Sequence, residues 1–164
     1  KIKRKIGKTF RILMEFAKLY YSIDKLNEEI TPKWGRMNSS MMLKHCRRFV
    51  NMYLNKTKSN LLYSLVGLFF GVFHRFYLKY IVRYNVKNYI KNLPTLKFFN
   101  THRYKDLDFE DEKIKLLNAL KEVESVEEKY IYNNFHGIVP NKAFKKVVYF
   151  HTSYHLYQFG VYGD

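Results

Sequence analysis

The sequence has almost none of the residues that build small cross-linked modules. Its 164 residues include a single cysteine, Cys46, so no internal disulfide can form and no cysteine-rich zinc knuckle can be built. The longest apolar run, residues 61–73, contains two glycines and falls short of the roughly 18 residues that a membrane span requires. The sequence therefore predicts no disulfide-stapled module and no integral membrane span.

Signatures of catalysis are also missing. The seven glycines form no Gly-rich phosphate loop, which removes the usual machinery of nucleotide hydrolysis. The acidic cluster between Asp106 and Glu112 lies at the start of a predicted helix, where the helix dipole explains it without catalysis. His151 and His155 are four residues apart, but the run around them is interpreted as extended, which argues against a shared metal. We expect no enzyme, no cofactor, no metal and no small-molecule substrate.

Acidic residues are absent from one long part of the chain. The sequence carries 30 Lys plus Arg against 14 Asp plus Glu, a formal net charge of +16. Residues 30–105 contain 15 basic side chains and no acidic one, whereas residues 106–164 contain 7 basic and 10 acidic side chains. Because a solvated surface normally mixes the two signs, the acid-free segment predicts contact with a phosphate polymer.

The remaining composition is that of a folded protein. Hydrophobic residues make up 47% and aromatic residues 18% of the chain, too many for a disordered basic tail. Alanine and proline occur three times each, while Lys, Asn, Ile, Tyr and Phe are plentiful. This bias is typical of an AT-rich genome and favours an organelle or an AT-rich microbe.

Local patterns predict alternating helices and strands. Helices are expected at residues 11–19, 37–54, 108–120 and 126–135, with Asn38 or Ser39 capping the second and a Ser125–Glu128 capping box opening the last. Strands are expected at residues 20–23, 80–84, 96–99 and 147–150, while residues 61–73 fit either helix or strand. The alternation predicts an α/β fold, with helices on both faces of a short parallel sheet. Residues 1–18 are interpreted as a basic N-terminal arm and first helix, and residues 19–164 as one domain with an apolar insertion near 55–77.

Several short segments, taken in order, match motifs of one known family. They are KTF at residues 8–10, YYSID at 20–24, Gly35 and Arg36 before a helix, YIVRYN at 80–85, KFFNTH at 97–102, and the loop with Gly137, Pro140 and Lys142. In this collinear arrangement the chain resembles the large-subunit ribosomal protein L-thirteen family, in its bacterial and organellar form. It departs from the family in residues 51–79, which are longer and lack the family's motifs. The resemblance implies an α/β/α sandwich that binds large-subunit ribosomal RNA without a catalytic residue.

Candidate RNA-binding residues come from two sources. The resemblance implies Arg36, Asn85, Lys97, His102, Gly137 and Lys142. The acid-free segment adds Lys44, Arg47, Arg48, Lys56, Lys58, Arg75, Lys79, Lys87, Lys91, Arg103 and Lys105. Lys8, Lys145 and Lys146 complete the predicted set.

The expected function is that of a structural constituent of the large ribosomal subunit. Such a protein would neutralise closely spaced phosphates of ribosomal RNA, contact neighbouring ribosomal proteins, and support ribosome assembly and translation. The mitochondrial matrix is the expected location. The alternative is an accessory subunit of a mitochondrial membrane complex of the respiratory type, with residues 61–73 against lipid or a hydrophobic partner.

Overall fold

The structure, a computed structural model, describes residues 14–57, 61–93, 100–134 and 136–163, and most of this chain is helical. The longer helices are the helix of residues 14–24, α2 (Ser39–Tyr53), α3 (Leu61–Phe76), α4 (Phe109–Ser125) and α5 (Asn141–Gln158). Two helical turns follow α3, the π-helical η1 (Tyr77–Ile81) and the 3-10 helix η2 (Val86–Asn88). A hairpin of β1 (Tyr130–Asn133) and β2 (Gly137–Pro140) precedes α5.

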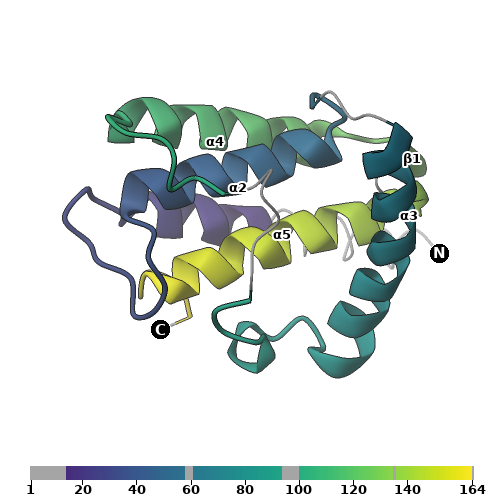
Figure 1. Cartoon of the computed structure of the whole chain (residues 1–164), viewed down its shortest axis with the longest axis horizontal. Helices are drawn as coiled ribbons and strands as arrows, with labels where there is room; N and C mark the ends of the chain where they lie inside the picture. The colour runs from purple at the N-terminus through teal and green to yellow at the C-terminus, as the bar shows by residue number, and fades with distance from the viewer. Residues whose placement is uncertain (1–13, 58–60, 94–99, 135, 164) are drawn as a thin grey trace.

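The long helices form a bundle with one helix across its end. Helices α2, α4 and α5 lie along the long axis of the molecule, and α3 runs down one end, across the direction of α5 (Figure 1). The helix of residues 14–24 packs on α4 and α5, since Tyr20 donates a hydrogen bond to Glu124 at 2.7 Å and the rings of Phe16 and Tyr149 are 6.4 Å apart. Because it is continuous across residue 18 and buries Leu19, this helix belongs to the bundle.

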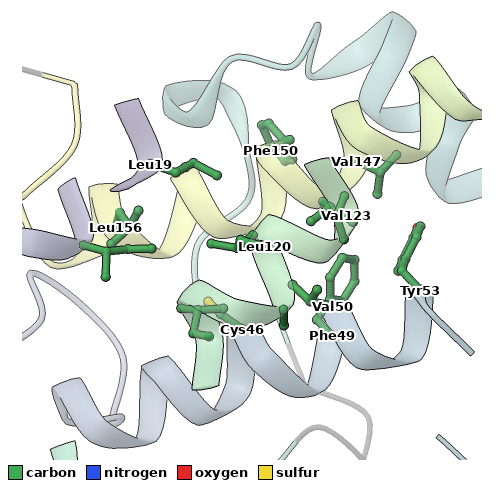
Figure 2. Close-up of a cluster of buried hydrophobic side chains, with 14 of the residues drawn as sticks. Leu19, Cys46, Phe49, Val50, Tyr53, Leu120, Val123, Val147, Phe150 and Leu156 are labelled. Carbon is green, nitrogen blue, oxygen red and sulfur yellow. The ribbon is translucent and has the colours of Figure 1, made fainter. Parts of the chain in front are cut away.

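The core lies where these helices meet (Figure 2). Its buried side chains include Leu19, then Cys46, Phe49, Val50 and Tyr53 from α2, Leu120 and Val123 from α4, and Val147, Phe150 and Leu156 from α5. The buried residues of α5 lie on most sides of the helix, so α5 is surrounded by other elements along much of its length. Burial of this kind is the main source of stability for a helix that would be marginal alone.

Two predicted helices, at residues 37–54 and 108–120, are confirmed, the first together with its predicted cap. Asn38 precedes α2 and accepts a hydrogen bond from the Met41 backbone N–H at 2.8 Å. Asp108 precedes α4 and accepts one from the Asp111 backbone N–H at 2.7 Å. Glu110, Asp111 and Glu112 in the first turn of α4 suit the positive end of the helix dipole. Local chemistry thus determines where both helices begin.

The predicted parallel sheet is wrong. Within the described ranges, the sheet consists of two antiparallel strands, with Tyr130 opposite Pro140 and Asn133 opposite Gly137. The α/β/α sandwich implied by the resemblance is therefore contradicted, and the resemblance has no support from the fold.

Four element predictions fail for identifiable reasons. Residues 20–23 and 147–150 are helical, because their apolar positions continue a helical period beyond the short window that looked extended. Residues 80–84 form part of η1 and a turn, and residues 126–135 contain β1 in place of a helix. The Ser125 hydroxyl donates back to the Glu122 carbonyl at 2.9 Å and so caps the end of α4. The predicted strand at residues 96–99 lies outside the described residues.

Candidate nucleic-acid interface

Four cations recur every four residues after α3 and form what we call the basic strip: Lys79, Arg83, Lys87 and Lys91. All four are exposed, and none forms an ion pair with a described residue. Arg83 was missing from the predicted set, although its regular spacing from Lys79 and Lys87 was readable in the sequence. The strip is thus a solvent-facing group of positive charges that no described carboxylate neutralises.

Buried anchors hold the chain segment that carries the strip. Leu78 and Val82 are fully buried, so the residues between them point outward. The ring of Tyr89 packs edge-on against Phe150 of α5 at 5.5 Å between centroids. The Tyr154 hydroxyl donates to the Ile90 carbonyl at 3.3 Å. These contacts dock the segment on α5 and present its cations on a supported surface.

Tryptophan holds the last cation of the strip in place. Lys91 Nζ lies 4.6 Å above the Trp34 ring, within the range of a cation–π interaction. Trp34 packs in turn against Tyr154 and Tyr157 of α5, with centroids 6.0 and 5.7 Å away. The aromatic contact orders the long lysine side chain and so lowers the entropy cost of a later phosphate contact.

Left-handed backbone occurs in the middle of the strip. Arg83 and Tyr84 are consecutive non-glycine residues with φ of 55° and 53°, a conformation that costs roughly 1 kcal/mol per residue for a side chain with a Cβ. Strain of this kind persists only when surrounding contacts enforce it. Here the buried Val82 and the edge-on contact of Tyr84 with Phe150, 5.9 Å between centroids, supply those contacts.

We predict that Arg83→Gly raises the free energy of unfolding by about 0.5–1 kcal/mol, because glycine adopts positive φ without strain. Urea unfolding would measure the change. Lys87→Gly is the matched control, since it removes one exposed charge at a position outside the residues with positive φ, and it should destabilise slightly. If Arg83→Gly and Lys87→Gly changed the free energy of unfolding equally, the backbone at Arg83 would not be strained.

A second group of cations surrounds one tyrosine. The Tyr104 hydroxyl accepts hydrogen bonds from Arg48 at 2.9 Å and Arg103 at 3.0 Å. Lys44 Nζ lies 4.4 Å from the centre of the same ring. Burial raises the pKa of Tyr104, but the Arg103 hydrogen bond and the charge of Arg48 outweigh burial, so the pKa is lowered overall. We call Lys44, Arg48, Arg103 and Tyr104 the Tyr104 cluster.

An internal carboxylate takes up part of this charge. Glu112 of α4 is 3% exposed and accepts from Lys44 Nζ at 2.9 Å and Arg47 Nε at 2.8 Å. Burial raises the pKa of Glu112, but its hydrogen bonds with Arg47 and Lys44 outweigh that and lower it overall. Arg47 is therefore paired within the protein, whereas Arg103 is exposed and forms no ion pair with a described residue.

The other predicted residues are dispersed. Lys56 pairs with Glu122, Arg75 donates to the His136 carbonyl at 3.2 Å, Lys145 donates to the Glu124 carbonyl at 2.7 Å, and Lys146 lies 4.1 Å from the Tyr84 ring centre. Arg36, Asn85, His102, Lys105 and Lys142 are exposed. Gly137 is the first residue of β2 and has φ of 65°, so the backbone conformation explains why glycine occupies this position. Lys8, Lys58 and Lys97 lie outside the described residues.

One helix presents apolar side chains to solvent. Leu65, Leu68, Phe69, Val72, Phe73 and Phe76 of α3 are between 38% and 63% exposed. They recur at spacings of three and four, so they share a side of the helix, which we call the apolar ridge. None of the described helices combines the length and the hydropathy of a transmembrane span. A ridge of this size on a small protein is typical of an interaction surface.

Comparison of the chain with protein-family models, with curated proteins and with solved structures found no match in any of the three.

Proposed function

We propose that this protein is a structural, RNA-binding constituent of a ribosome, with large-subunit ribosomal RNA as its partner. Cations of the basic strip would contact successive phosphates, and the Tyr104 cluster would add a second contact region. Mitochondrial ribosomes are the proposed setting because of the compositional bias of the sequence. The proposal rests on charge and geometry, since the described residues contain two antiparallel strands and not the parallel sheet that the family resemblance implied.

The basic strip is the observation that carries the proposal. Exposed cations usually alternate with carboxylates, because mixed signs avoid self-repulsion. Here four exposed cations follow one another on a docked segment, and the nearest acidic residues in sequence are beyond residues 30 and 105. A group of exposed cations without nearby carboxylates suits the negative charge of a nucleic-acid backbone.

Salt dependence tests the proposal directly. If the strip neutralises about four phosphates, raising monovalent salt from about 50 to 200 mM should weaken binding to a ribosomal RNA fragment by about 50- to 150-fold. Replacing Lys79, Arg83, Lys87 and Lys91 with glutamine should reduce the slope of log affinity against log salt by about 3. Fluorescence anisotropy with a labelled fragment measures both quantities.

A matched variant separates geometry from net charge. Lys25, Lys115, Lys121 and Lys129 are also exposed, and Lys115 pairs with Asp111 at 2.5 Å. Replacing these four with glutamine changes the net charge equally and should leave the slope near that of the wild type. A flat salt response of the wild type, or equal losses in both variants, would reject the strip as the RNA contact.

The apolar ridge favours a second candidate function, an accessory subunit of a mitochondrial membrane complex. In that case Phe69 and Phe73, whose rings lie 4.8 Å apart, would pack against a hydrophobic subunit or the lipid surface. Fractionation distinguishes the two functions. A ribosomal protein should sediment with the large subunit, and its position in the gradient should change when EDTA dissociates the ribosome. A subunit of a membrane complex should migrate with the detergent-solubilised complex, and EDTA should not change its position.

A further inference from the structure

Three histidines meet between α2 and α5. The helical conformation of α5 places His151 and His155, four residues apart, on one side of the helix. His45 of α2 faces them, with ring centroids 5.1 Å from His151 and 4.7 Å from His155. One nitrogen from each of the three lies within 4.8 Å of the others. The sequence prediction of an extended run had separated this pair, and the helix reverses that conclusion.

Two of the ring nitrogens are at the spacing of metal ligands. Nε2 of His45 and Nε2 of His151 are 3.3 Å apart, so without a metal one ring can donate an N–H to the other. Two nitrogens bound to one Zn²⁺ at about 2.0–2.1 Å with tetrahedral angles are about 3.3–3.4 Å apart. The ligand nitrogen of His155 lies at most 4.8 Å from those of His45 and His151. It must therefore move by at most about 1.5 Å to reach the nitrogen–nitrogen spacing of a tetrahedral Zn²⁺ site.

A glutamine fixes which nitrogen of His155 can bind a cation. Gln158 Nε2 donates to the Trp34 carbonyl at 2.6 Å, so its amide oxygen must face the other way. That oxygen lies 2.8 Å from His155 Nδ1, and because an amide oxygen only accepts, Nδ1 must carry the proton. The lone pair of His155 therefore resides on Nε2. A second hydrogen bond of this type orients metal-binding histidines generally.

The loop before α2 leaves room for this glutamine. Gly35 has φ of 88°, and a Cβ at that position would lie 2.6 Å from Gln158 Nε2. The Lys33 backbone N–H donates to the Gln158 carbonyl at 2.8 Å. Residues 33–35 thus hold both the backbone and the side chain of Gln158, which is the positioning residue for His155.

Packing orients these imidazoles. His45 and His155 are only 4% and 9% exposed. His151 Nδ1 is buried and has no hydrogen-bond partner in the described chain. The His151 ring stacks on Phe49, with the two ring centroids 3.7 Å apart and the ring planes inclined by 4°. The orientation of the rings is therefore fixed by the protein before an ion binds.

We propose that His45, His151 and His155 bind one Zn²⁺ through their imidazole nitrogens and thereby clamp α2 to α5. An all-imidazole set suits Zn²⁺ and disfavours the oxygen-seeking Mg²⁺ and Ca²⁺. With three protein ligands, water would fill the fourth position of the ion. This site is independent of the RNA-binding proposal, since it uses none of the basic strip.

Cobalt is the probe for the site, because tetrahedral Co²⁺ has visible d–d absorption that the octahedral aqueous ion lacks at comparable strength. Untagged, metal-free protein titrated with Co²⁺ should develop this absorption and saturate at one equivalent, and Zn²⁺ should displace it. In His151→Phe the ring stack on Phe49 is kept, so the protein should remain folded by circular dichroism and lose affinity by more than about 100-fold. His102→Phe, at an exposed site, should bind as the wild type does.

Variants of the positioning residue provide the second readout. Gln158→Leu should weaken Co²⁺ binding by about 10- to 100-fold while leaving all three ligands in place. Gln158→Glu keeps an acceptor for Nδ1 but loses the donor to the Trp34 carbonyl, so it should recover part of the affinity. Absence of the tetrahedral spectrum in the folded wild type would overturn the proposal. Equal spectra and affinities in wild type and His151→Phe would overturn it as well.

Discussion

Replacing Glu112 with glutamine is expected to lower the free energy of unfolding by about 3 kcal/mol, because removal of one partner leaves buried positive charge uncompensated. Glu112 lies on α4 and bridges Lys44 and Arg47 of α2, so it joins two helices across their main interface. The side chains of Lys44 and Arg47 keep 14% and 21% of their surface. That partial exposure places the loss at the lower end of the range for buried pairs.

Urea unfolding at neutral pH measures this loss, and Glu110→Gln is the matched control. Glu110 is exposed in the same first turn of α4, so its replacement should cost less than about 0.5 kcal/mol. The same Glu112 variant releases Lys44 and Arg47 and should therefore bind RNA more tightly than the wild type. A loss of stability equal to that of the control would show that the bridge contributes nothing beyond helix-dipole compensation.

Acidification is expected to destabilise the protein well above the pH at which carboxylates titrate. Burial first, then the nearby Arg75 and His74, lower the pKa of His136 from 6.5 to about 3. Its Nε2 is hydrogen-bonded to the Tyr53 hydroxyl at 2.6 Å, inside the core. Between these two values the unfolded chain binds a proton that the folded protein does not bind. Stability is therefore complete above pH 6.5 and falls as the pH drops from there toward about 3.

The expected loss from His136 alone is about 2 kcal/mol between about pH 6.5 and 5, at about 1.4 kcal/mol per pH unit. Chemical unfolding in metal-free buffer at several pH values gives the slope. His136→Gln should reduce that slope by about one proton, even if it also lowers stability at neutral pH. His102→Gln removes an exposed histidine and should leave the slope unchanged. A wild-type slope in His136→Gln would show that the proton is taken up elsewhere.

Sequence patterns predicted the elements whose signals are local. The cap residue Asn38 identified the start of α2, and the acidic residues of the first turn identified that of α4, since both signals act within a few residues of the helix start. Short aromatic and β-branched runs led to wrong strand predictions. Over four positions, residues such as Val147 to Phe150 suit a strand and a buried helix equally well. Their helical period is apparent only over the full length of α5.

For the candidate interface, the sequence identified the acid-free segment but not which of its cations remain available. In the sequence, nothing distinguishes Lys44 and Arg47 from Lys87. In the structure, Lys44 and Arg47 pair with a carboxylate, that of Glu112, which is 65 or more positions away. The Tyr104 cluster and the clamp of Trp34 on Lys91 likewise join residues distant in the chain. Such pairings depend on helix packing, which no local pattern specifies.

The sequence by itself determined the charge of this protein and where that charge is concentrated, because both are properties of composition. It also indicated where α2 and α4 start, since capping and helix-dipole effects act within one turn. Tertiary structure alone decided that the protein is a helical bundle, that Glu112 neutralises Lys44 and Arg47, and that His45 meets His151 and His155. The physical reason is that packing brings together groups more than 60 residues apart, and a buried charge or imidazole acquires its chemistry only from those neighbours.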